Sequence, residues 1–273
     1  MKAIYILLGV SLFACKTSDS SNDQLKSMLS GTTLPEDMAT NDGDTIGLWS
    51  IDYLMGKFEP AKDTAFTLVD SRYADREGLY LRKDVYHAFL QMYEAALKEN
   101  IKLIIRSATR NFEYQKKIWE DKWDGVVPLE SRKRANIISD EALRAQEILK
   151  YSAMPGSSRH HWGTDIDLNA FNNRYFEKGQ GLVIYTWLQN HAGTFEFCQP
   201  YSSKGASRPN GYEEEKWHWS YLPISGQLTA LAENNLKDSM IFGFKGAEQA
   251  QNLKIVNNYV LGIDSTCLPR IIE

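Results

Sequence analysis

The stretch "SSRHHWGTDIDL", residues 157–168, places two histidines, two aspartates and a glycine where a polar loop leads into an alternating segment. Its last four letters, "DIDL", alternate polar and apolar side chains, as a strand with one face in the core does. Successive side chains of a strand point to opposite faces, so Asp165 and Asp167 share one face and Ile166 takes the other. The stretch therefore predicts a strand that carries two carboxylates on one side.

Helical and strand-like patterns are interspersed on both sides of this stretch. Helical spacing or capping residues predict helices at 81–101, 111–123, 139–154, 181–192 and over most of 226–262. Runs rich in β-forming residues predict strands at 102–110, 164–168, 194–201 and within 213–223. Residues 46–75 suggest short strands and turns. Because no strict βαβ rhythm is present, we expect an α+β fold with a central, largely antiparallel sheet flanked by helices.

Composition narrows the class of protein. The 273 residues are 43% hydrophobic and 24% charged, with a formal net charge of -4, which is typical of a globular protein with a sizeable core. No basic block is present, so nucleic acid is not expected as a partner.

The N-terminus predicts export. Lys2 precedes an apolar run, residues 3–14, that is too short to span a bilayer and is typical of a signal peptide. The run ends in "LFAC", which resembles the lipobox of bacterial lipoproteins, so residues 1–14 are predicted to be removed and Cys15 to carry the lipid. A polar tract, 15–45, would then tether the protein to the membrane of the cell envelope. The alternative is an ordinary signal peptide with an incidental cysteine.

Cys198 and Cys267 are the two remaining cysteines. In an exported chain they predict a disulfide, which would join the C-terminal segment to the body of the protein. We accordingly divide the chain into a main domain, 46–225, and a helical extension, 226–273, packed on it.

Three of the five histidines lie near carboxylates. A loop that brings His160 or His161 to an aspartate of "DID" could supply two ligands to one ion, and His218 is the candidate for a third. Such a set leaves a tetrahedral zinc site with one open position for water. Zinc lowers the pKa of water towards ~7, and Glu215, three residues before His218, could accept its proton. Spacing alone leaves the choice of histidine and aspartate open.

Three motifs resemble those of one family. "SRHHWGTDID" is similar to the Ser-x-His-x-x-Gly-x-Ala-x-Asp motif of VanY/VanX-like zinc D,D-carboxypeptidases and D,D-dipeptidases, "EKWH" to their Glu-x-Trp-His motif, and "SATRNFEYQ" to their Ser-Gly-Tyr-Arg-Ser-x-x-x-Gln segment. The likeness covers residues 75–223 and implies the α+β fold shared by D,D-peptidases and the hedgehog signalling domain.

The resemblance also implies roles for individual residues. It makes Zn2+ the cofactor, with His160, Asp167 and His218 as its ligands. His161 takes a variable position of the motif. The catalytic residues would be Glu215, as the base, and Arg110, beside the oxyanion.

Two further positions and two departures concern the substrate. Ser158 and Gln115 match residues that line the family's substrate pocket. Asp165 stands where the family usually has alanine, and could either orient a ligand histidine or repel an acidic substrate. Ala108-Thr109 replace the usual Gly-Tyr, which would reshape the pocket wall.

The function implied is hydrolysis of peptidoglycan stem peptides by a lipid-anchored zinc peptidase, foremost as a D-alanyl-D-alanine carboxypeptidase. Related activities are alternatives: a peptidoglycan endopeptidase or a D,D-dipeptidase. Two non-enzymatic functions are further alternatives: a zinc-stabilised lipoprotein that binds the cell wall, and a structural lipoprotein.

Overall fold

The computed structural model describes residues 49–206 and 208–268, which all fall in one compact unit. The predicted signal peptide, the predicted tether and Cys15, the predicted site of lipidation, lie outside these residues. Within them, no helix is long and apolar enough to cross a bilayer. The main elements are α2 (Ile51–Leu54), β1 (Phe66–Leu68), β2 (Tyr80–Arg82), α3 (Lys83–Lys98), β3 (Ile105–Ser107), α4 (Phe112–Trp123), α5 (Glu141–Ile148), β4 (Asp165–Leu168), α6 (Gly179–His191), β5 (Phe197–Cys198), β6 (His218–Tyr221), α7 (Leu222–Asn235) and α8 (Gln249–Leu253).

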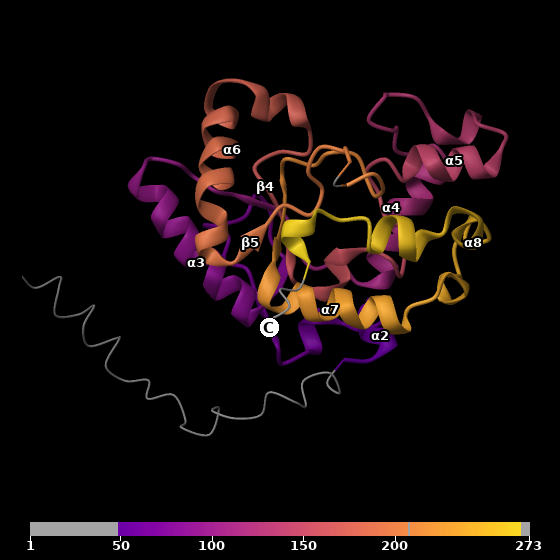
Figure 1. Cartoon of the computed structure of the whole chain (residues 1–273), viewed down its shortest axis with the longest axis horizontal. Helices are drawn as coiled ribbons and strands as arrows, with labels where there is room; N and C mark the ends of the chain where they lie inside the picture. Colours follow the sequence, from indigo (N-terminus) through magenta and orange to yellow (C-terminus); the bar gives the residue numbers. More distant parts are fainter. Residues whose placement is uncertain (1–48, 207, 269–273) are drawn as a thin grey trace, which may run out of the picture. The chain divides into compact units, whose positions relative to one another are not determined.

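A four-stranded antiparallel sheet lies at the centre, in the order β3-β4-β6-β5, and β1 and β2 form a separate antiparallel pair. Helices α3 and α6 pack on one side of the sheet (Figure 1). Helices α4, α5, α7 and α8 share a second core with the loop that precedes β4. The predicted α+β class with an antiparallel sheet flanked by helices is confirmed.

Local sequence explains where the helices form. In α3, Val85, Phe89 and Met92 repeat at helical spacing and are fully buried against the sheet. Helix α4 begins after Asn111, whose side-chain oxygen accepts a hydrogen bond from the backbone N–H of Tyr114 at 2.9 Å. Asp140 caps α5 in the same way.

Several elements differ from their predicted extent. The strands predicted at 102–110 and 194–201 pair only over Ile105–Ser107 and Phe197–Cys198. The second strand starts late because the chain before it forms a 3-10 turn, Ala192–Phe195, followed by a left-handed residue at Glu196. Residues 46–75 contain the one-turn helix α2 as well as β1, and a single turn is too short to show a helical period. The region 226–262 continues α7 only to Asn235 and then breaks into short turns of helix.

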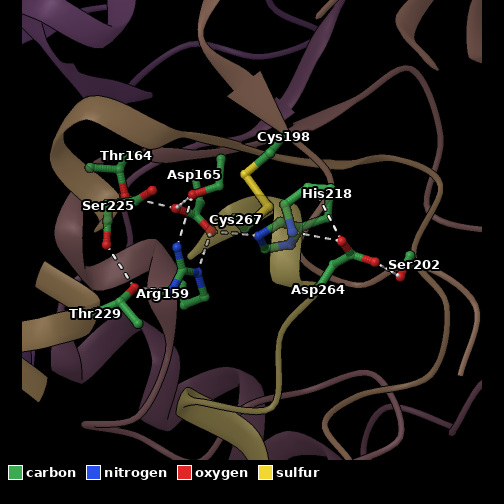
Figure 2. The surroundings of a disulfide bond; sticks show 12 residues. Arg159, Thr164, Asp165, Cys198, Ser202, His218, Ser225, Thr229, Asp264 and Cys267 are labelled. Carbon is green, nitrogen blue, oxygen red and sulfur yellow. Dashed lines mark hydrogen bonds and ion pairs between the residues drawn. A yellow bond between two sulfur atoms is a disulfide. The ribbon is translucent and has the colours of Figure 1, made fainter. Parts of the chain in front are cut away.

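The C-terminal segment shares a core with the rest of the unit. Leu228, Ala232 and Ile255 are buried in the same cluster as Leu54 and Trp119. The segment is also joined to β5, because a disulfide links Cys198 to Cys267 (Figure 2). Close by, the Asp264 N–H donates to the Pro200 carbonyl at 2.8 Å. The C-terminal segment around Asp264 and Cys267 therefore anchors β5 and the start of the loop that follows it.

Reduction of the disulfide should destabilise the protein. The two cysteines are 69 residues apart, and opening a loop of that length should lower the free energy of unfolding by about 4 kcal/mol. Urea unfolding with and without a reductant measures the difference. A Cys198→Ser/Cys267→Ser variant is the control, since it should not respond to reductant. Equal unfolding curves for the oxidised and reduced parent would contradict the prediction.

Candidate zinc centre

The register of β4 against β6 assembles the site. Asp167 pairs directly with His218, and Asp165 with Ser220, so these four side chains share one face of the sheet. The intervening pair, Ile166 and Trp219, is buried in the core on the opposite face. One strand pair thus brings together residues 51 positions apart in the sequence.

His160 reaches this face from a short 3-10 turn, Arg159–Trp162, just before β4. The turn ends at Gly163, which has a φ of 72°, and a Cβ there would lie 2.4 Å from the Phe66 ring. Only glycine fits this left-handed and crowded position. The reversal at Gly163 lets His160 and Asp167 converge, as the motif spacing predicts.

His160, Asp167 and His218 form a compact cluster. One ligand atom from each lies within 4.8 Å of the others, and all three side chains are buried. His160 Nδ1 lies 2.9 Å from the Ala108 carbonyl, so this nitrogen carries the proton and Nε2 is free to bind a cation. Within residues 49–206 and 208–268, His160 Nε2 and Asp167 Oδ1 are both buried without a hydrogen-bond partner. Such orphaned atoms, in a set of two imidazoles and one carboxylate, fit zinc.

The second histidine presents its other nitrogen. His218 Nε2 lies 2.8 Å from Asp165 Oδ2, while its Nδ1 lies 3.3 Å from Asp167 Oδ1 and 3.2 Å from Glu215 Oε2. Nδ1 therefore faces the cluster. Glu215 is buried beside it, at the end of the loop that leads into β6.

Burial and nearby charges shift the pKa values of the cluster. Burial lowers the pKa of His160 and raises that of Glu215. Burial also opposes the charged form of His218, but its hydrogen bond to Asp165 and the nearby carboxylates of Asp167 and Glu215 outweigh it and raise the pKa of His218 well above its usual value. The cluster therefore attracts positive charge, which a proton or a metal cation can supply.

A narrow cleft opens onto the cluster. It has a volume of about 30 Å³, and its lining residues are Arg110, Tyr151, Ala153, Ser158, Arg159, His160, Tyr201, Tyr212, Glu215 and His218. Arg110 and Ser158, for which the resemblance implies roles at the oxyanion and in the substrate pocket, both line this cleft. The backbone N–H of Arg110 donates to the His160 carbonyl at 3.1 Å, and the positive charge of Arg110 acts to lower the pKa values of both His160 and Glu215.

Gln115 is not among the lining residues. It is fully buried on α4, and its Nε2 donates to the carbonyl of Ala153 at 2.8 Å. Ala153 itself lines the cleft. The expectation that Gln115 lines the substrate pocket therefore does not match its position. Helix α4 turns the side chain towards the core, where it contacts the buried side of the segment that carries Ala153.

His161 has a structural position. Its Nδ1 donates to the Arg110 carbonyl at 2.6 Å, and its Nε2 accepts from the Gly156 N–H at 3.0 Å. Burial lowers the pKa of His161 to about 3, so the ring is neutral and satisfies both groups. Within the motif, His161 holds the backbone of Arg110 while His160 faces the cluster.

Sequence reasoning missed all three tyrosines that line the cleft, Tyr151, Tyr201 and Tyr212. Tyr201 packs edge-on against His218, with ring centroids 4.7 Å apart, and Tyr212 packs against Tyr201 at 4.9 Å. Tyr212 could have been noticed three residues before Glu215. Tyr201 carries no local signal, because only the folding of the β5–β6 loop brings it to the site.

The chain belongs to the VanY family. The family model for VanY, D-alanyl-D-alanine carboxypeptidase, matches residues 78–224, which is more than half of the chain. This match contains all three clustered residues together with Glu215 and Arg110. The resemblance stated from the motifs is confirmed.

Individual relatives of this chain share less than a third of their aligned residues with it. The carboxypeptidase-like protein YodJ of Bacillus subtilis is 28% identical over 173 residues, which cover 62% of this chain and 56% of that protein. A D-alanyl-D-alanine carboxypeptidase of Enterococcus faecalis is 26% identical over 133 residues, which cover 49% of this chain and 45% of that protein. The chain thus spans about half the length of these curated relatives.

Solved structures of similar proteins include a mutant of the vancomycin-resistance D,D-pentapeptidase VanY in complex with Zn(II). It is 21% identical, with a TM-score of 0.46, over 63% of this chain and 86% of that one. The LD-carboxypeptidase LdcB is also 21% identical, with a TM-score of 0.46, over 75% of this chain and 81% of that one.

Zinc should stabilise the protein. A ligand present at about 100 times its Kd adds about 2.7 kcal/mol to the free energy of unfolding, which corresponds to a rise in Tm of roughly 5–10 °C for a domain of this size. Differential scanning fluorimetry of chelator-treated protein, with and without Zn2+, measures the rise. Mg2+ should have no comparable effect, because it prefers oxygen ligands.

Two histidine variants control this measurement. His160→Ala should abolish the response to zinc, whereas His87→Ala, at an exposed position of α3, should respond like the parent. A zinc-dependent rise in Tm that persists in His160→Ala would place the ion elsewhere.

Proposed function

We propose that the protein is a zinc-dependent peptidase of bacterial cell-wall peptidoglycan that removes the terminal D-alanine from stem peptides ending in D-Ala–D-Ala. The observation that supports this most strongly is the convergence of His160, Asp167 and His218 with Glu215 and Arg110 in one buried cleft. Membership of the VanY family supports the peptidase class.

His160, Asp167 and His218 would hold the zinc ion. Zinc bound there supplies a Lewis acid, which polarises a carbonyl and makes water more acidic. Glu215 accepts the proton of the attacking water and returns it to the leaving amine. Burial raises the pKa of Glu215, which brings it closer to neutral pH and suits both steps.

Arg110 and Tyr212 stabilise charge on the substrate in this proposal. Arg110 lines the cleft, and its buried Nε has no hydrogen-bond partner among the described residues, so the guanidinium can bind a carbonyl oxygen as it becomes negative. Tyr212 is also buried in the wall of the cleft, and its hydroxyl has no hydrogen-bond partner among the described residues. Burial raises the pKa of Tyr212, so the hydroxyl stays protonated and can donate to the same substrate.

The rest of the stem peptide has space beside the cleft. A groove of about 860 Å³ begins at Tyr151, which also lines the cleft, and continues past Trp217 to Arg132 and Arg174. Its two arginines suit the carboxylates of a stem peptide. We further propose that export, with lipid on Cys15 as the anchor, brings the protein to this substrate in the cell envelope.

Replacement of the base tests the proposal. Glu215→Gln should leave zinc bound and lower the rate of hydrolysis by about 10²–10⁴-fold, because the general base is lost. Mass spectrometry of muropeptides after incubation measures the reaction and identifies the bond cut. Glu213→Gln is the matched control: its carboxylate pairs with Lys204, and the variant should be as active as the parent.

Each product has a distinct meaning in this assay. Loss of one D-alanine supports the carboxypeptidase, whereas loss of a dipeptide or of a crosslink assigns the same site to a dipeptidase or an endopeptidase. Parent protein that binds zinc but leaves every muropeptide intact would instead support a non-catalytic cell-wall-binding role.

Tyr212→Phe tests the tyrosine separately. Loss of a hydrogen bond to a charged group should lower kcat/KM by roughly 10–100-fold. The free energy of unfolding should change by less than about 0.5 kcal/mol, because the hydroxyl bonds to no described protein group. Tyr259→Phe, in the same aromatic cluster but outside the cleft lining, should retain parental activity. Parental kcat/KM in Tyr212→Phe would exclude a role for this hydroxyl.

A further inference from the structure

Asp165 is a second buried carboxylate on the metal-facing side of β4. It is fully buried, lies two residues before Asp167 and stands where the family motif usually has alanine. The family pattern therefore assigns it no role. Its contacts connect it to one member of the zinc centre.

All the acceptor positions of this carboxylate are in use. Oδ2 accepts from His218 Nε2 at 2.8 Å and from Arg159 Nε at 3.2 Å, and Oδ1 accepts from the hydroxyls of Thr164 and Ser220, each at 2.7 Å (Figure 2). Four donors fix the carboxylate in position, so the hydrogen bond to His218 has a fixed direction.

This hydrogen bond determines which nitrogen of His218 faces the metal. When Nε2–H donates to Asp165, the lone pair of the ligand ring is on Nδ1, which points towards Asp167 and Glu215. A carboxylate behind a metal-binding histidine orients the ring and makes it a better donor.

Arg159 balances the charge of Asp165. Both side chains are 0% exposed, and the Arg159 guanidinium also donates to Ser220 at 3.0 Å and lies over the Trp162 ring, 4.5 Å from its centroid. An unpaired carboxylate this close to the cleft would repel an acidic substrate. The paired one has its charge neutralised within the protein, which favours orientation of the ligand over repulsion.

The same arginine connects the site to the C-terminal segment. Arg159 donates to the Thr229 hydroxyl on α7 at 2.8 Å, and Thr229 in turn donates to the Ser225 carbonyl at 2.7 Å. Helix α7 thereby fixes the guanidinium that holds Asp165. This contact gives the C-terminal helix a part in the zinc centre, although none of its side chains lines the cleft.

We propose that Asp165, held in place by Arg159, is a positioning residue that fixes His218 for metal binding through Nδ1. The inference rests on the proposed zinc-dependent function, and it adds a partner behind the ligand that the family motif does not contain. Its alternative is a purely structural role, in which the ion pair only ties β4 to α7.

Two double variants separate these roles. Arg159→Met/Asp165→Asn removes both charges but keeps an oxygen acceptor for His218, whereas Arg159→Met/Asp165→Ala removes the acceptor as well. Removing both partners leaves no unpaired buried charge, so both proteins lose the same ion pair. The Kd for Zn2+, from competition with a chromophoric chelator, should stay within about threefold of the parent for the Asn variant. It should rise about 10–100-fold for the Ala variant.

A spectroscopic measurement and a control accompany the affinities. The visible d–d spectrum of the Co2+-loaded protein should change in the Ala variant and be retained in the Asn variant, because only the former lets the His218 ring turn. His87→Ala, at an exposed position of α3 outside the cleft, should bind zinc within about threefold of the parent. Equal zinc affinities and Co2+ spectra for the Asn and Ala variants would overturn the proposal.

A measurement on the parent covers the case in which a variant fails to fold. In 15N-histidine-labelled protein loaded with 113Cd2+, we expect 113Cd–15N coupling at Nδ1 of His218 and a proton on Nε2. Coupling at Nε2 would overturn the inference. Failure of the parent to bind zinc at all would instead reject the proposed function, so the two failures are distinguishable.

Discussion

The pairing of β4 with β6 is the constraint on which the rest of the site depends. The strands place Asp167 opposite His218 on one face, and Ile166 beside Trp219 in the core on the other. A shift of one residue would move the apolar pair to the site and the ligands into the core. Burial of two large apolar side chains therefore fixes the geometry of the candidate zinc centre.

This arrangement buries several charged groups close together. Asp165, Asp167 and Glu215 are all buried around His218, and burial opposes ionisation of each carboxylate. The protein compensates Asp165 with Arg159, whereas Asp167 Oδ1 lies 3.3 Å from His218 Nδ1 and has no hydrogen-bond partner among the described residues. One carboxylate is thus satisfied by the protein and the other is available to a cation. This contrast separates Asp165, which supports His218 from behind, from Asp167, which is a candidate ligand.

Sequence patterns predicted the long elements well and the short ones poorly. Helix α3 could be predicted because its apolar residues repeat over four turns, and α4 because Asn111 caps it. The one-turn helix α2 and the two-residue strand β5 have too few residues to show a period. At the site, the resemblance to the family motif selected His160 over His161, but it also placed Gln115 in the pocket wall, whereas its side chain lies behind Ala153.

The sequence by itself determined the family, the order of the motifs and the residues that can ligate zinc, since these depend on residue identity and spacing along the chain. Tertiary structure decided which nitrogen of His160 and His218 faces the cluster, because the Ala108 carbonyl and Asp165 occupy the other one. It also decided the neighbours of Asp165. Arg159 and Ser220 come from separate segments and both donate to its carboxylate, and Arg159 in turn donates to Thr229 on α7.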